Sequence, residues 1–295
     1  MFFISILELI YTKCYDVTKL KLKRMLFLII FCLIQGFSEF LPISSQGHLI
    51  VYNHFFYLDE FSELSILELN VISHLGSLFA VVLYYNRLLF RMFKGLRVFY
   101  RPDLDKNLSL LFNLVVSTIP IVIFGYIFGK YFNYDDDNLI LIIGITSVLF
   151  AIILFILDKY CLLVRNQEAI NSKLALYTGF LQCLALIPGV SRSGAIMIAL
   201  RSLGFNRNFT VRYSNLLSIP VILGATVFIF SNGNNNLFID DFLNLSVIIV
   251  FFLSFLFSII FIHFLITWVR KSSLFIFIIY RIFFGSALII FFFNT

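Results

Sequence analysis

Two long stretches of the chain contain no charged residue, and this constrains the fold more than any other feature. Leu139–Leu157 and Phe242–Val269 lack Asp, Glu, Lys and Arg. A helix of about 20 mostly apolar residues spans the hydrocarbon core of a bilayer. Soluble domains carry about a quarter charged residues, whereas this chain has 13% charged and 61% hydrophobic residues. The sequence therefore predicts an all-α polytopic membrane protein.

The charged residues that remain lie mostly in short segments between the apolar ones. Basic segments at 87–106 and 158–173 are expected to be cytoplasmic, and the acidic segment near 130–138 and the segment 232–241 external. The net charge is +6, but the basic residues lie mostly in these short segments between spans. No nucleic-acid partner is therefore expected. Six spans are predicted near residues 69–85, 108–129, 139–157, 213–231, 243–266 and 274–293.

Two clusters of polar residues interrupt apolar runs, one in each half of the chain. They extend over Gln35–His48 and Gln182–Gly194, and each contains a proline, Pro42 or Pro188. The apolar arm on either side of each proline is short for about 30 Å of hydrocarbon. We predict that each cluster is the tip of a re-entrant helical hairpin, because polar groups at membrane depth are normally kept where they line a cavity or a protein interior.

The order of these elements predicts an inverted-topology repeat, in which each half has one re-entrant hairpin and three transmembrane helices. The predicted repeats are residues 25–157 and 175–295, joined by a cytoplasmic linker at 158–174 and forming one membrane domain. Such repeats place a binding site where the two interrupted helices meet. Aligning Pro42 with Pro188 puts Ser45 on Ser191, but leaves Gln35 and Gln182 offset by one residue.

The N-terminal segment 1–24 conflicts with this topology. Its basic residues favour the inside, whereas the absence of Lys and Arg from 25–86 indicates that the first hairpin enters from outside. Either the segment is an extension upstream of a start at Met25, or residues 25–52 cross the membrane differently. The first alternative is preferred.

The first hairpin tip contains the residues needed for acid–base or nucleophilic chemistry. A carboxylate at membrane depth, here Glu39, is functional by default, and Gln35 shares its helix face. Ser44 or Ser45 follows a proline and is expected at a helix N-terminus, which favours an anion. His48 lies three residues after Ser45 and is the candidate base for an activated hydroxyl.

The second tip contains an arginine at membrane depth, Arg192, between Ser191 and Ser193. Its planar guanidinium matches phosphate oxygens. The alternative is a structural ion pair with Glu39. A cavity with one carboxylate, one arginine, one histidine and several hydroxyls suits a phosphate or diphosphate on a lipid. His74 is interpreted as a helix-packing residue, and close helix contacts are predicted at Gly144, Gly224 and Gly285.

Four stretches carry a resemblance to a known family. They are Gln35–His48, His74–Val82, Gln182–Ala195 and Arg212–Ala225. On these stretches the chain resembles the undecaprenyl-diphosphate phosphatase family of the bacitracin-resistance type, from Met25 almost to its end.

The resemblance implies that the chain hydrolyses undecaprenyl diphosphate to the monophosphate carrier lipid used in cell-wall synthesis, which gives bacitracin resistance. It implies a multi-pass protein of the bacterial inner membrane, a site open to the periplasm, and a divalent cation, Mg²⁺ or Ca²⁺. Glu39 would either orient His48 or hold that cation. The catalytic positions correspond to Glu39, Ser45, His48 and Arg192. The expected substrate-binding residues are Gln35, Ser44, Ser191, Ser193 and Gln182.

Two residues depart from the family pattern, and one other function competes. Gln35 replaces a more common Glu, which leaves fewer charges for a metal, and Ile196 replaces a common Thr. A lipid transporter or flippase without hydrolysis is the alternative, because inverted repeats with broken helices are typical of transporters. The nucleophile also stays open between Ser45, His48 and a metal-activated water.

Overall fold

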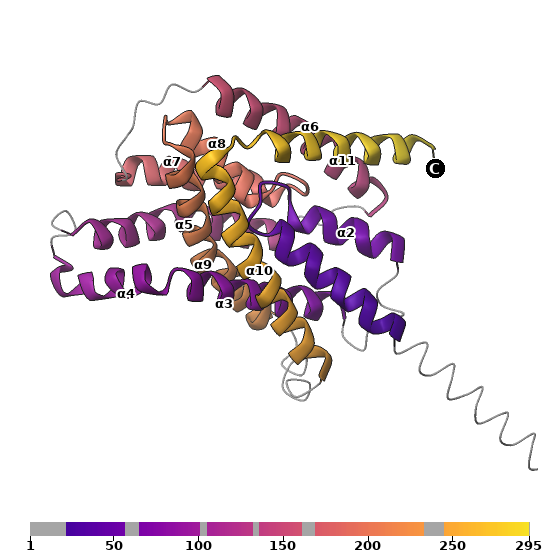
Figure 1. Ribbon diagram of the computed structural model, residues 1–295, viewed down its shortest axis with the longest axis horizontal. Coiled ribbons are helices and arrows are strands. Elements are labelled where there is room, and N and C mark those ends of the chain that lie inside the picture. The colour runs from indigo at the N-terminus through magenta and orange to yellow at the C-terminus, as the bar shows by residue number, and fades with distance from the viewer. Residues whose placement is uncertain are drawn as a thin grey trace, which may run out of the picture.

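The computed structural model describes residues 22–56, 65–100, 105–131, 136–160, 169–232 and 245–294. Within these residues the regular elements are helices (Figure 1). Six of them are long and apolar enough to cross a membrane. They are α3 (Ile66–Tyr84), α5 (Lys106–Tyr131), α6 (Asp136–Tyr160), α9 (Arg207–Asn232), α10 (Leu245–Lys271) and α11 (Phe275–Asn294). The six predicted spans are therefore confirmed. The described residues leave out most of segment 1–24. They also leave out most of the loops that were predicted to be external.

The first predicted hairpin is a helical hairpin in the structure. A helix over residues 22–38 leads into a turn, and α2 (Ser45–Phe56) returns beside it (Figure 1). The two arms meet at their far ends, where the Tyr52 hydroxyl donates to the Phe27 carbonyl at 3.2 Å and the rings of Phe27 and Phe56 lie 5.7 Å apart. The chain thus turns back near Pro42, as predicted.

The second hairpin has the same form. Helix α7 (Ser172–Gln182) continues into a 3₁₀ turn, η4 (Cys183–Leu186), and α8 (Arg192–Ser202) returns after Pro188. The hydroxyls of Tyr177, midway along α7, and of Ser202, at the end of α8, lie 3.5 Å apart and connect the two arms. The direction in which each hairpin enters the bilayer stays a prediction.

The two hairpin tips share a backbone motif that corrects the predicted alignment of the halves. Ser44 and Ser191 have φ of 75° and 70°, and each side chain accepts the amide of a glycine three residues later, Gly47 or Gly194. Ser44 therefore corresponds to Ser191, and with the same spacing of nine residues Gln35 corresponds to Gln182. Pro42 and Pro188 differ by one position because the helix N-caps, rather than the prolines, fix the turn. Each hairpin precedes three long helices, but the opposite orientation of the halves and their boundaries stay predictions.

Glycines allow two of the long helices, α6 and α11, to approach each other closely. A Cβ on Gly285 would lie 2.6 Å from the Gly144 carbonyl oxygen, and a Cβ on Gly144 would lie 3.0 Å from the Gly285 carbonyl oxygen. Helices α6 and α11 can pack backbone to backbone only because both residues lack a side chain. The prediction for Gly224 was wrong, because its Cβ would be in ordinary contact, 3.8 Å from Val122.

The basic segment after α3 forms a short amphipathic helix rather than a loop. Helix α4 (Asn86–Gly95) is followed by one 3₁₀ turn, η2 (Leu96–Val98). Met92 is fully buried, whereas Arg91 and Lys94 are exposed. Such a helix suits the membrane interface, where basic residues stay in water.

A buried ion cluster fixes the position of α8 relative to its neighbours. Asp158 near the end of α6 accepts from Arg207 at 2.8 Å and pairs with Arg201 at 3.2 Å, and it also accepts the amide of Leu274. Asp158 and Arg201 are 6% and 3% exposed. One carboxylate thus joins α6, α8, the start of α9 and the start of α11.

Replacing Asp158 by alanine should lower the stability of the folded protein. Removing one partner of a buried ion pair leaves the other charge uncompensated, so we expect a loss of about 3 kcal/mol and a lower thermal midpoint in detergent. The matched control is Lys159→Gln, because Lys159 is the exposed neighbour and surface changes are usually within about 0.5 kcal/mol. Equal midpoints for the two variants would show that the cluster does not stabilise the fold.

Candidate functional site

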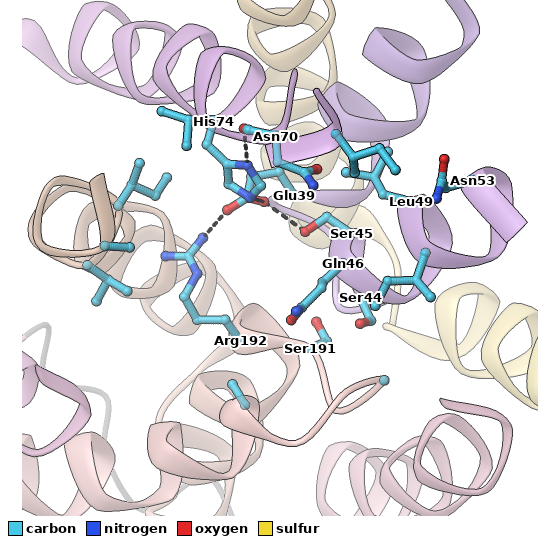
Figure 2. Close-up of a pocket in the computed structure, with 18 of the residues that line it drawn as sticks. Glu39, Ser44, Ser45, Gln46, Leu49, Asn53, Asn70, His74, Ser191 and Arg192 are labelled. Carbon is cyan, nitrogen blue, oxygen red and sulfur yellow. Dashed lines mark hydrogen bonds and ion pairs between the residues drawn. The ribbon is translucent and has the colours of Figure 1, made fainter. Parts of the chain in front are cut away.

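A cavity of about 540 Å³ lies between the two hairpin tips (Figure 2). The tips supply Ser44, Ser45 and Gln46 on one side and Ser191 and Arg192 on the other. Helix α3 adds Asn70 and His74, and α9 adds a largely apolar wall. The site therefore forms where the two interrupted helices meet, as the sequence predicted.

Glu39 is at the centre of the polar end of the cavity. Its Oε2 accepts from the Ser45 hydroxyl at 2.8 Å and from the Gln35 amide at 3.1 Å, and lies 3.4 Å from His74 Nε2. Its Oε1 accepts from Arg192 Nη2 at 2.9 Å. Glu39 is only 6% exposed, so desolvation strengthens each of these interactions. One carboxylate thus connects both hairpins and α3 (Figure 2).

Arg192 has binding capacity beyond its bond to Glu39. Nη2 donates to the carboxylate, whereas the buried Nη1 has no hydrogen-bond partner among the described residues. The ion pair with Glu39, which was the alternative interpretation of Arg192, is therefore present, but it uses only part of the guanidinium. A buried donor without a partner is costly, and a ligand with acceptor oxygens would satisfy it.

Two helix N-termini face the same cavity. Helix α2 begins at Ser45 and α8 begins at Arg192, and the preceding residues Ser44 and Ser191 also line the cavity. The positive ends of two helix dipoles and their free amides favour an anion at this point. With Arg192 beside them, the arrangement suits a group with several anionic oxygens.

His48 lies outside the cavity lining, although it was the predicted base for Ser45. Its Nδ1 lies 2.7 Å from the Ser44 carbonyl and its Nε2 lies 2.7 Å from the Tyr280 hydroxyl. Because a carbonyl only accepts, Nδ1 carries the proton and Nε2 accepts from Tyr280. The ring also stacks on Phe284 at 4.1 Å. Both ring nitrogens are occupied, so the geometry favours a structural role for His48 at the first hairpin turn.

The histidine at the site is His74, and its interpretation as a packing residue was wrong. His74 lines the cavity and lies 3.4 Å from Glu39, while its Nδ1 donates to the Asn70 carbonyl at 2.7 Å. Its Nε2 therefore faces the Glu39 carboxylate at the polar end of the cavity. An ionisable side chain within a span is itself a functional signal, and this signal could have identified His74.

Three other residues that were predicted to bind substrate are buried outside the cavity lining. Gln35 is fully buried and bonds Glu39 and, at 3.5 Å, Ser77. Ser193 donates to the Leu41 carbonyl at 2.7 Å, which joins the two hairpins. Gln182 is fully buried, and neither of its amide atoms has a partner among the described residues. None of these three residues lines the cavity.

The rest of the cavity wall is mostly apolar. Helix α9 contributes Val221, Ile222, Ala225 and Ile229, which recur at three- and four-residue intervals along one face. Leu49 and Ile50 of α2 and Leu139 of α6 complete this region. The cavity thus has a polar end, with Arg192 and two helix N-termini, and an apolar wall, which suits an amphiphile with an anionic head.

The comparisons with known proteins agree on one family. The family described as bacitracin resistance protein BacA matches residues 28–287. A relative from Pelagibacter ubique (strain HTCC1062), described as undecaprenyl-diphosphatase, is 40% identical over 269 residues, which cover 90% of this chain and 97% of the relative. A second protein with the same description, from Erythrobacter litoralis (strain HTCC2594), is 33% identical over 291 residues, which cover 90% of this chain and 98% of that relative. The chain belongs to the bacitracin resistance protein BacA family.

Proposed function

We propose that this membrane protein hydrolyses undecaprenyl diphosphate to undecaprenyl phosphate and inorganic phosphate. The observation that carries the proposal is the position of Glu39, which bonds a hydroxyl of the first hairpin and a guanidinium of the second in one cavity. A nucleophile with a base in contact and a phosphate-binding arginine are the parts that phosphoryl transfer needs. The relatives' description as undecaprenyl-diphosphatase names the same chemistry.

The cavity fits the two ends of such a substrate. The diphosphate would bind at the N-termini of α2 and α8 beside Arg192, and the first isoprene units would lie along the apolar wall of α9. By family membership the protein would act in the bacterial inner membrane, with its site open to the periplasm. The product would then be the carrier lipid returned to cell-wall synthesis, and its recycling would give bacitracin resistance.

Ser45 is the nucleophile in this proposal. Its hydroxyl would attack the terminal phosphorus and pass its proton to Glu39 Oε2, which accepts that hydrogen bond in the structure at 2.8 Å. The bond from phosphorus to the bridging oxygen breaks, and undecaprenyl phosphate leaves with that oxygen. A water molecule then attacks the phosphorus of the phosphoserine, and the bond from phosphorus to Ser45 Oγ breaks. Oγ takes back the proton held by Glu39, and phosphate leaves with the protons of the water. Arg192 stabilises the charge on the phosphoryl oxygens, and His74 lies beside it, facing Glu39.

A divalent cation fits the site only with help from the substrate. The described residues contain no group of three His, Cys, Asp or Glu side chains that could hold a metal. Glu39 is the carboxylate that lines the cavity, and Gln35 Oε1, which lacks a partner in the described structure, is buried behind it. Mg²⁺ is often bound by one or two carboxylates with phosphate oxygens and waters, so Glu39 would hold Mg²⁺ or Ca²⁺ together with the diphosphate. The bound ion would neutralise charge on the phosphoryl groups.

The experiment that tests the proposal follows both products. Purified protein in detergent is incubated with undecaprenyl diphosphate, with Mg²⁺ or with a chelator, and the mixture is analysed by phosphorus NMR. We expect undecaprenyl phosphate and inorganic phosphate in equal amounts. Unchanged diphosphate in both samples, together with movement of the lipid across proteoliposome membranes, would instead support a transporter.

His74→Gln should lower kcat/KM for undecaprenyl diphosphate by about 10²-fold, because it removes the imidazole that lines the cavity and faces Glu39 beside the phosphoryl site. Phosphate release by the folded variant measures the effect. The control is His263→Gln, because His263 lies on α10 with an exposed contact to Tyr84 and should keep wild-type turnover. Equal activity of the two variants would exclude His74 from the reaction.

A further inference from the structure

Arg281 of α11 is a buried cation that the proposed reaction does not use. Its side chain is 0% exposed, and it lies in a helix that is long and apolar enough to span the membrane. Among the described residues no carboxylate forms an ion pair with it. Burying a charge without a counter-ion is strongly unfavourable, and charges at membrane depth usually mark function.

The guanidinium of Arg281 bonds the turns of both hairpins. Nη1 donates to the Pro42 carbonyl at 3.2 Å. Nη2 donates to the carbonyls of Gly189 and Val190 at 3.0 and 3.2 Å. One side chain therefore joins two turns that are far apart in the sequence.

The acceptors lie directly before the two helix N-caps. Pro42 is two residues before Ser44, and Gly189 and Val190 precede Ser191. Ser44, Gly189 and Ser191 have φ of 75°, 89° and 70°. A positive φ is unfavourable for a residue with a side chain and persists only where the surroundings hold it. The three bonds from Arg281 hold the turns that contain these residues.

Arg281 also lies against the first turn of α8. A Cβ on Gly194 would be 3.0 Å from Arg281 Nη1, and Gly194 is in the same turn as Arg192. The positive charge of Arg281 therefore adds to the positive end of α8 that faces the cavity. An anion bound there would be the counter-charge that the described residues do not provide.

We propose that Arg281 is a positioning residue for diphosphate. It holds the two hairpin turns so that the N-termini of α2 and α8 face the same anion, and its charge stabilises that anion from behind the cavity wall. This inference rests on the proposed function, because it assumes that the cavity binds a diphosphate.

Binding of inorganic diphosphate separates this role from a structural one. The variants are Arg281→Met, which removes the charge, and Arg281→Lys, which keeps the charge but cannot reach all three carbonyls. The control is Arg201→Met, because Arg201 is also buried and bonds backbone carbonyls but pairs with Asp158. Calorimetric titration in detergent gives the Kd, the thermal midpoint monitors folding, and turnover of undecaprenyl diphosphate gives kcat.

We expect Arg281→Met to bind inorganic diphosphate about tenfold more weakly than wild type. Arg281→Lys should keep the Kd within about threefold but lower kcat about tenfold, because a point charge cannot hold both turns. Arg201→Met should lose thermal stability and keep the wild-type Kd. A wild-type Kd in folded Arg281→Met, or a wild-type kcat in Arg281→Lys, would overturn the proposal. If Arg281→Met does not fold, the Kd and kcat of Arg281→Lys test the proposal in its place. Because the binding measurement needs no turnover, it tests Arg281 even if the wild-type protein releases no phosphate.

Discussion

Arg192→Ala is expected to lower kcat/KM for undecaprenyl diphosphate by about 10³-fold or more, the range found for arginines that stabilise transferred phosphoryl groups. Arg192 bonds Glu39 through Nη2 and keeps a buried Nη1 available in the described structure. Nη1 would stabilise the transition state most strongly, because negative charge develops there on the phosphoryl oxygens. Arg192→Lys should also lose most activity, about 10²-fold, since an ammonium cannot bond the carboxylate and the phosphate in a fixed fork.

The folded state should survive the change at Arg192. Glu39 keeps its contacts with Ser45, Gln35 and His74 when the guanidinium is removed. The control is Arg201→Met, which removes a buried guanidinium from the same helix, α8, but not from the cavity. Phosphate release should collapse in Arg192→Ala and persist in the folded fraction of Arg201→Met. Near wild-type turnover in Arg192→Ala would remove Arg192 from the reaction.

Ser45→Ala is expected to abolish turnover to a similar extent, about 10³-fold or more, because it removes the nucleophile. The structure favours Ser45 over His48, since Ser45 contacts Glu39 directly and both ring nitrogens of His48 are already bonded. The matched control is Ser38→Ala. Ser38 is equally part of the first polar cluster, but its hydroxyl bonds the Ile34 carbonyl.

Trapping the intermediate separates the remaining mechanisms. Wild-type protein is mixed with undecaprenyl diphosphate labelled in its terminal phosphate, denatured with SDS at neutral pH so that both phosphoserine and phosphohistidine survive, and digested, and the labelled peptide is identified. We expect the label on the peptide that contains Ser45. Label on His48 would reverse the assignment, and substantial activity in Ser45→Ala would favour direct attack by water.

The architecture was predictable because it depends on local composition. Charge-free runs such as Leu139–Leu157 have few alternatives to a membrane span, and a proline within a short polar cluster predicts a break in a helix. These two rules gave the six long helices, both hairpins and their meeting point at Glu39 and Arg192. The alignment of the halves was off by one position because the turns follow the N-caps Ser44 and Ser191, whose positive φ is not visible in sequence.

The side-chain partners at the site were less predictable because they come from distant helices. His48 is near Ser45 in sequence, but Tyr280 and Phe284 of α11 bind its ring outside the cavity. His74 comes from α3 and reaches Glu39 only after the hairpin packs beside it. Spacing along one helix predicted the contact of Gln35 with Glu39. Spacing cannot indicate which histidine from another helix will contact Glu39.

Release of labelled phosphate tests the central claim most directly. Purified wild-type protein and Arg192→Ala are compared in the same detergent, on undecaprenyl diphosphate labelled in its terminal phosphate. The structure predicts that the wild type releases one labelled phosphate for each lipid converted, and that the variant is slower by about 10³-fold. If the wild type releases no phosphate, or if both proteins release it at the same rate, the cavity between the two hairpins is not a diphosphatase active site.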